Sequence, residues 1–325
     1  MRRSWLALIV VVLIIGGAVL ISTRLKPPAT EPTEGPAPST ATVPSTTAPP
    51  TTATTPSTAA PSTATRVGTA TPSTATAVPE PPKPEPPDAK VLLDDAERLV
   101  AARKPLEAIQ ALSRAMAHSP KPADAKAIAT RLTKLVDEVL FSRRPCPPLS
   151  VTHEVVSGDS LWRIARKHHT TIGLVKRLNG LKSDAIRVGQ RLKIIPGGFD
   201  VEVVKSQFRL TVTKDGLWIR QFKVGLGKDG ATPVGEYMAG HSITEPPYTA
   251  VYPPIPFEDH KNNPLGTRWV TIQGAGKGQY GIHGTWEPDS IGKERSKGCI
   301  RMLNDDVEWL FDLLVPGHSK IVIRP

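Results

Sequence analysis

Two residues near the end of the chain are suited to nucleophilic chemistry. Cys299 lies downstream of His283, and glycines stand beside them at Gly284 and Gly298. A cysteine attacks an amide carbonyl as its thiolate, so it needs a nearby base and backbone donors for the oxyanion. Glycines let the backbone approach a substrate closely. Taken alone, the pair leaves a packed contact and a weak metal site open beside catalysis.

β-Strands must position this pair. Short runs of alternating apolar and polar residues follow Phe199, a pattern typical of strands. An Asp-Gly pair at 215–216 separates two such runs and predicts a hairpin turn. The predicted strands cover 201–204, 209–213, 217–224 and 270–273, and a helix is expected at 305–314. We therefore predict a mainly β domain at 199–325.

Four sequence blocks in this domain resemble the YkuD-type L,D-transpeptidase catalytic domain. They are GATPVGEY at 230–237, IHGT at 282–285, SIG at 290–292 and SKGCIRM at 296–302. The resemblance implies a sandwich-like β fold in which Cys299 is the nucleophile and His283 its general base. It also implies that the backbone carbonyl of Gly284 orients the imidazole.

The same resemblance implies roles for three further positions. Ser296 would support the site, backbone N–H groups around Gly298 and Cys299 would serve the oxyanion, and Arg301 would hold the site or the substrate. Lys297 stands where many members have a second histidine, so a role for that histidine does not carry over. No metal ion and no organic cofactor are expected, because the thiolate supplies the nucleophile.

The implied substrate is the peptide stem of peptidoglycan. Cys299 would attack the carbonyl of the third stem residue, at the L-centre of a diamino acid such as diaminopimelate, and expel D-alanine. An acceptor amine would then take the acyl group and form a 3-3 cross-link. Transfer to water would make the enzyme an L,D-carboxypeptidase, and transfer to a protein lysine would attach a protein to the wall. A non-catalytic peptidoglycan-binding scaffold and another Cys-His amidase or endopeptidase are the rival hypotheses.

Residues 152–196 predict a strand, two helices and a second strand. This unit resembles the LysM module, which binds N-acetylglucosamine-containing glycans of peptidoglycan and chitin. The matching blocks are VSGDSLWRIA at 156–165, LN at 178–179 and IRVGQRLKI at 186–194. The resemblance implies a sugar groove lined by Gly158, Asp159, Ser160, Leu161, Asn179 and Gly180. We expect Trp162, Ile164 and Leu178 to lie in the core of the module.

A helical segment precedes this module at 88–145. Apolar residues from Ile128 to Leu140 recur at helical spacing and form one face. Pro105 is suited to a helix start, and the prolines at 120 and 122 interrupt the pattern, so three helices are predicted. The segment is weakly similar to a tetratricopeptide hairpin. We interpret it as a spacer or a docking element, with a protein partner as a further possibility.

The N-terminal part of the chain predicts a membrane tether. The uncharged apolar stretch from Trp5 to Thr23 matches the roughly 20 residues that cross a bilayer, so 1–26 is interpreted as an uncleaved signal anchor. The Pro-, Thr-, Ser- and Ala-rich segment at 27–87 lacks a core and predicts a disordered linker. We expect a single-pass protein of the cell membrane whose catalytic part is extracytoplasmic, in the periplasm or cell wall.

Charge and cysteine content argue against two classes of protein, one that binds nucleic acid and one that is held together by disulfides. The net charge of +11 suits an anionic surface or polymer, but the basic residues are scattered and no nucleic-acid-binding motif is present. Two cysteines, Cys146 and Cys299, exclude a disulfide framework. The sequence therefore predicts a multidomain wall enzyme: an anchor, a linker, a small all-α segment, a LysM module and a mainly β catalytic domain.

Overall fold

The computed structural model describes residues 88–118, 121–276 and 280–325. The predicted anchor at 1–26 and the whole of the predicted linker at 27–87 lie outside these ranges. Within the described residues, no helix combines the length and apolar character that a bilayer span requires.

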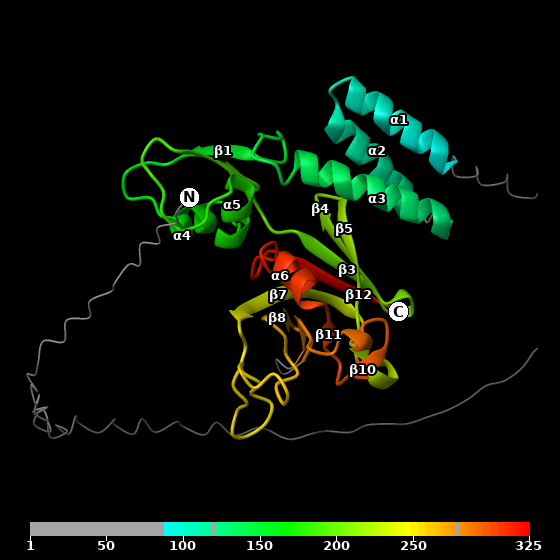
Figure 1. Ribbon diagram of the computed structural model, residues 1–325, viewed down its shortest axis with the longest axis vertical. Helices are drawn as coiled ribbons and strands as arrows, with labels where there is room; N and C mark the ends of the chain where they lie inside the picture. Colours follow the sequence, from blue (N-terminus) through cyan, green and yellow to red (C-terminus); the bar gives the residue numbers. More distant parts are fainter. Residues whose placement is uncertain (1–87, 119–120, 277–279) are drawn as a thin grey trace, which may run out of the picture. The chain divides into compact units, whose positions relative to one another are not determined.

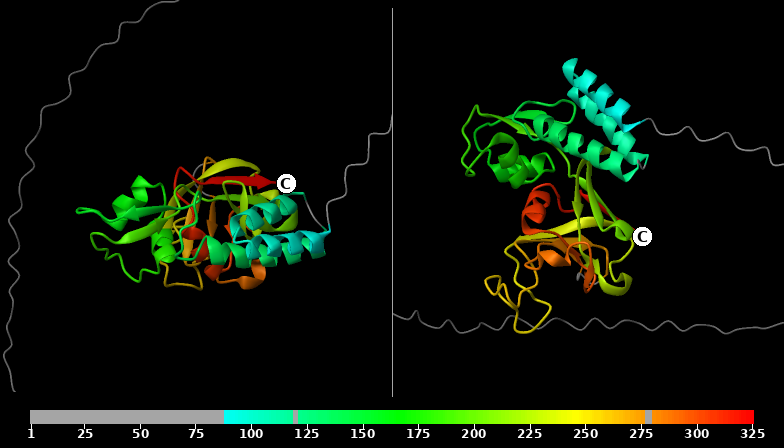
Figure 2. Two further views of the ribbon diagram at one scale, coloured as in Figure 1. Left: turned by 90° about the horizontal axis from the view of Figure 1, so that it is seen from above. Right: turned by 45° about the vertical axis from the view of Figure 1, so that its right-hand side comes forward.

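Three helices open the described part of the chain, as predicted. They are α1 (Ala89–Ala101), α2 (Pro105–Ala117) and α3 (Pro122–Val139). Proline occupies the first position of α2 and of α3, where its missing N–H costs no helical hydrogen bond. The apolar face predicted for α3 is buried, including Ile128, Leu132 and Leu135. The helices lie side by side in the views of Figures 1 and 2.

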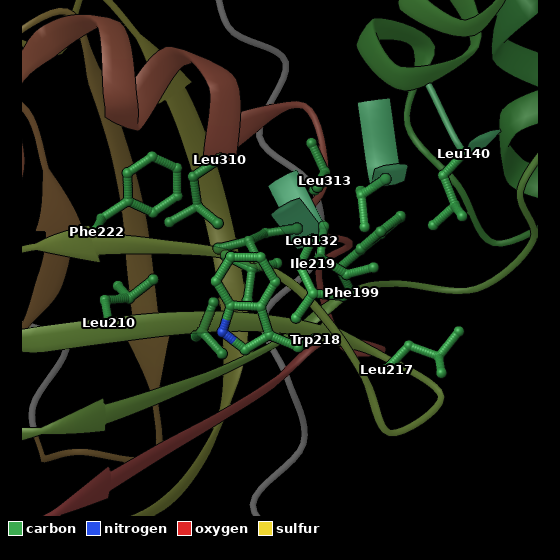
Figure 3. Packing of buried hydrophobic residues seen from close by; sticks show 14 of the residues in the cluster. Leu132, Leu140, Phe199, Leu210, Leu217, Trp218, Ile219, Phe222, Leu310 and Leu313 are labelled. Atoms are coloured by element: carbon green, nitrogen blue, oxygen red, sulfur yellow. The ribbon is translucent and has the colours of Figure 1, made fainter. Parts of the chain in front are cut away.

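The helical segment packs against the large β-sheet of the C-terminal domain. Leu132 of α3 belongs to the same buried cluster as Ile219 in the sheet, which Figure 3 shows from close by. The backbone N–H of Trp218 donates to Ser113 Oγ at 3.1 Å, and Arg220 pairs with Asp137 at 2.5 Å. The segment is therefore docked on the domain and shares its core.

The unit predicted at 152–196 has the expected order of strand, helix, helix and strand. It consists of β1 (Val151–Glu154), α4 (Leu161–Lys167), α5 (Ile172–Asn179) and β2 (Arg191–Ile194), with β1 and β2 antiparallel. Ser160 caps α4, its side-chain oxygen accepting a hydrogen bond from the backbone N–H of Arg163. The expectation that Trp162 is a core residue was wrong: its side chain is 57% exposed, because its position on α4 faces away from the buried Leu161 and Ile164.

Polar contacts join the module to its neighbours in the chain. The buried Lys193 ammonium donates to the carbonyls of Val139, Leu140 and Ser142 at 2.7 to 3.1 Å and so binds the end of α3. On the other side Arg177 pairs with Asp312 of the catalytic domain at 2.5 Å.

Eight strands of the domain at 199–325 form one mixed sheet with the order β11-β9-β8-β7-β12-β3-β4-β5. Two neighbouring pairs, β11–β9 and β12–β3, are parallel, and the others are antiparallel. The predicted Asp-Gly hairpin turn joins β4 to β5, with positive φ at both Asp215 and Gly216. The strands are β3 (Asp200–Val204), β4 (Arg209–Lys214), β5 (Leu217–Lys223), β7 (Gly235–Thr244), β8 (Arg268–Gln273), β9 (Gly281–His283), β11 (Ile300–Arg301) and β12 (Lys320–Arg324).

Smaller elements complete the catalytic domain. A separate parallel pair joins β6 (Leu226–Gly227) to β10 (Glu294–Ser296), and α6 (Asn304–Phe311) packs on β8 and β9. Short 3-10 turns cover Lys205–Gln207, Lys228–Gly230 and Pro288–Ser290. The mainly β prediction is confirmed. The described strands do not divide into two large sheets, because β12 joins β3 to β7 and makes the sheet continuous.

Candidate active site

The predicted cysteine and histidine lie on neighbouring strands. In the parallel β9–β11 pair Arg301 is in register with His283, and continuing this register places Cys299 opposite Gly281. The backbone of Gly281 hydrogen bonds to the Cys299 thiol. Residues two apart on a strand share one face, and so do paired residues on adjacent strands. The thiol, the imidazole and the guanidinium of Arg301 therefore belong to the same face of the sheet.

His283 is held in one tautomer. Its Nδ1 lies 2.6 Å from the carbonyl oxygen of Gly284. A carbonyl only accepts hydrogen bonds, so Nδ1 carries the proton and the lone pair is on Nε2. The ring of Trp269 stacks on the imidazole with centroids 5.6 Å apart and planes at 19°. Because the side chain is 3% exposed, it has little freedom to turn.

Burial favours the neutral forms of both groups. Desolvation lowers the pKa of His283 to about 4, aided by the positive charge of Arg301, although its bond to Gly284 opposes the change. Desolvation also raises the pKa of Cys299, against the opposing effects of the Gly281 hydrogen bond and Arg301. At neutral pH the site therefore holds a thiol beside a neutral imidazole whose Nε2 can accept a proton.

Ser296 shapes the turn that carries the cysteine. Its hydroxyl donates to the carbonyl of Cys299 at 2.6 Å and accepts from the N–H of Gly298 at 3.1 Å. The side chain is buried, so water does not compete for these bonds. The N–H of Gly298 is thus engaged inside the turn and is not directed at an oxyanion in this structure.

Gly298 is required by its backbone conformation and by its neighbours. Its φ of +127° lies in a region that residues with side chains rarely adopt. A Cβ there would lie 2.5 Å from Cε1 of Tyr280 and 2.9 Å from the carbonyl oxygen of Ala231. The alanine belongs to the GATPVGEY block, so the fold brings two of the four blocks into contact at the cysteine turn.

Two parts of the chain match known protein families. Residues 198–323 match the L,D-transpeptidase catalytic domain family, YkuD, and residues 153–194 match the LysM domain. YkuD of Bacillus licheniformis, named as an L,D-transpeptidase, is 30% identical over 174 residues, which cover 53% of this chain and 98% of that protein. The chain belongs to the L,D-transpeptidase family. YqjB of Bacillus subtilis, also named as an L,D-transpeptidase, is 38% identical over 133 residues, covering 40% of this chain and 73% of that protein.

The guanidinium of this L,D-transpeptidase's Arg301 is anchored beside the cysteine. It pairs with Glu287 at 2.8 Å, while the backbone of Arg301 exchanges hydrogen bonds with Gly225 at 2.8 and 2.9 Å. The Arg301 side chain is 13% exposed and Glu287 63%, so the pair lies at the edge of the site. The backbone of Arg301 is therefore fixed by Gly225, and its side chain reaches the edge of the site.

Sequence reasoning missed residues that support the site. Trp269 was outside the predicted strand at 270–273, and nothing in a single strand pattern identifies the histidine on which it stacks. Glu287 and Gly281 were not selected because their partners lie on other segments. No group of three or more His, Cys, Asp or Glu side chains within the described residues is arranged to hold a metal ion.

In the LysM module, three of the six predicted glycan residues lie in the first loop and a fourth, Leu161, begins α4. Asp159 accepts from His153 at 2.9 Å and from the N–H of Val156 at 3.0 Å, and these hydrogen bonds lower the pKa of its carboxyl group. Ser160 caps α4, and Gly158 has a positive φ. Leu161 is 2% exposed and packs in the core of the module, so its side chain contributes no surface to a groove.

The other two predicted glycan residues lie at the end of α5. The Asn179 amide donates to the carbonyls of Val175 and Lys193 and accepts from the N–H of Lys193, each at 2.8 Å. Gly180 ends the helix in the left-handed conformation. Both residues have structural roles, and Asn179 also lines a cavity of about 420 Å³ with Gln190.

Proposed function

We propose that the enzyme forms a thioester between Cys299 and the third residue of a peptidoglycan stem, then transfers that acyl group to an acceptor amine. The observation that carries this proposal is the hydrogen bond from His283 Nδ1 to the Gly284 carbonyl at 2.6 Å. It leaves the basic Nε2 on the face of the sheet shared with Cys299. The match to the LysM domain supports binding of the glycan of the same polymer.

The first half of the reaction uses His283 as base and then as acid. Nε2 takes the proton of the Cys299 thiol as sulfur attacks the stem carbonyl at the L-centre, because the resting pair is neutral. The tetrahedral adduct collapses, its bond to the D-alanine nitrogen breaks, and Nε2–H protonates the leaving amine. This leaves a thioester and a neutral imidazole.

The second half regenerates the thiol. An acceptor amine attacks the thioester carbonyl and gives a proton to Nε2, and the departing sulfur recovers that proton. The product is a 3-3 cross-link if the amine belongs to another stem. Arg301, paired to Glu287 at the edge of the site, faces the anionic groups of the donor. Backbone N–H groups of the cysteine turn other than Gly298's serve the oxyanion.

Mass spectrometry of muropeptides tests this proposal. Protein lacking residues 1–26 is incubated with tetrapeptide-containing muropeptides, and the expected products are free D-alanine and 3-3 linked dimers. Cys299→Ala should form neither product, with Cys146→Ala as the matched thiol control that retains both. Equal D-alanine release by wild type and Cys299→Ala would refute the nucleophile. Tripeptides without dimers would instead assign transfer to water.

We also propose that residues 5–23 anchor the enzyme in the membrane, with the linker at 27–87 leading to the wall. The uncharged apolar length of this stretch supports the proposal. Fully extended, the linker could span on the order of 190 Å at about 3.1 Å per residue. The full chain should stay with membranes after a carbonate wash, and the chain lacking 1–26 should not. Release of the full chain by that wash would contradict the anchor.

A further inference from the structure

Asn304 lies where the backbone of Gly284, the residue after His283, meets the segment that contains Gly266 and Thr267. It is the first residue of α6, and the N-cap residue of that helix, Leu303, makes no side-chain capping bond. The Asn304 amide does not cap its own helix either. Instead its Oδ1 accepts from the backbone N–H of Thr267 at 3.2 Å, just before β8. The side chain therefore links α6 to the strand next to β9.

The same amide oxygen fills the space between two glycines. A Cβ built on Gly284 would lie 2.1 Å from Asn304 Oδ1, and one built on Gly266 would lie 2.0 Å from it. The Gly266 Cβ would also lie 2.6 Å from the Gly284 Cα. The backbone segments at Gly266 and Gly284 thus cross each other against the Asn304 amide. This crossing has no room for an additional atom at either glycine.

This crossing determines where the Gly284 carbonyl points. The N–H of Gly284 donates to the carbonyl of Arg268 at 3.2 Å, which fixes one side of the residue. Asn304 and Gly266 fix its Cα from the other side. The carbonyl held in this way is the acceptor for His283 Nδ1. Movement of Gly284 would turn the carbonyl and release the imidazole from its tautomer.

We propose that Asn304 is a positioning residue that orients His283 through Gly284. It does not touch the substrate. The inference deepens the proposed function, because it assumes that His283 acts as the base. A displacement of about 1 Å at a catalytic group can cost on the order of 100-fold in rate. Asn304→Ala should accordingly lower kcat about 10- to 100-fold and change KM little, since the substrate-contacting residues remain.

Two variants and a spectroscopic measurement separate positioning from folding. Asn304→Asp keeps an acceptor oxygen for the Thr267 N–H, so it should retain most of kcat. Its carboxylate should also move the acidic limb of the kcat/KM profile to higher pH by favouring the charged imidazole. Asp305→Ala, exposed on the same helical turn, is the matched control and should behave like wild type.

Nitrogen NMR of the His283 ring gives a readout that does not depend on activity. Wild type and Asn304→Asp should show a protonated Nδ1, and Asn304→Ala should show a mixture of tautomers. An Asn304→Ala protein with wild-type kcat and an unchanged Nδ1 signal would overturn the proposal. If Asn304→Ala does not fold, wild-type kcat and an unchanged Nδ1 signal in Asn304→Leu, which is of similar size but lacks the acceptor oxygen, overturn it. If the proposed function itself is wrong, Cys299→Ala will remain active. That result separates its failure from failure of the inference about Asn304.

Discussion

Acid should destabilise the enzyme through its buried histidine. The ordinary pKa of 6.5 for a histidine falls to about 4 for His283, chiefly because burial disfavours the charged ring. Between these two values the unfolded chain binds more protons than the folded chain. The stabilisation is therefore complete above pH 6.5 and declines as the pH falls toward 4.

The expected loss follows from the two pKa values. Each pKa unit corresponds to roughly 1.4 kcal/mol, so the full difference amounts to about 3 kcal/mol below pH 4. Proton linkage gives a loss of about 2 kcal/mol between pH 7 and pH 5. The His283→Asn variant removes the titrating group and keeps a side-chain N–H that can donate to the Gly284 carbonyl.

Urea unfolding at pH 7 and pH 5, followed by tryptophan fluorescence, measures this difference. Wild type should lose about 2 kcal/mol more unfolding free energy on acidification than His283→Asn. His168, whose pKa burial also lowers, titrates in both proteins and cancels in the comparison. Equal losses in the two proteins, or a His283 titration midpoint near 6.5 by NMR, would refute the reasoning.

Two further predictions concern the cysteine turn and the LysM contact. Gly298→Ala should reduce D-alanine release about 100-fold or more and lower the unfolding free energy by about 2 to 4 kcal/mol. Gly317→Ala is its control, because Gly317 also has a positive φ but nothing within 4 Å of an added Cβ, so activity should be normal. Asp312→Ala should cost about 1 kcal/mol, since the Arg177 and Asp312 side chains are 31% and 26% exposed. In a double-mutant cycle with Arg177→Ala by urea unfolding, fully additive costs would show that the pair contributes nothing.

The sequence predicted those parts of the fold that depend on neighbouring residues. Alternation of apolar residues located β3, β4 and β5, and Asp215-Gly216 located the turn between the last two. Pro105 was expected at a helix start and opens α2, because the geometry of proline acts within a few residues. Local chemistry is sufficient for features of this kind.

The sequence did not predict features that depend on which segments meet. Trp162 was expected in the core because apolar residues usually are, but the face that a short helix buries depends on what packs against it. The sequence did not show that the helical segment packs against the sheet. The role of Ser113 likewise depends on the fold, because its hydroxyl accepts a hydrogen bond from the backbone N–H of Trp218. Such contacts join residues far apart in the chain.

By itself the sequence determined the chemistry that this protein carries: a Cys299 nucleophile candidate, a His283 base candidate and two recognisable domains, since these depend on residue types at fixed spacing. Tertiary structure decided the state of that chemistry. Burial makes the thiol and imidazole neutral, the Gly284 carbonyl selects the tautomer, and Asn304 meets Gly284 across the crossing. Desolvation and long-range contacts arise only when distant segments exclude water together, so no local pattern specifies them.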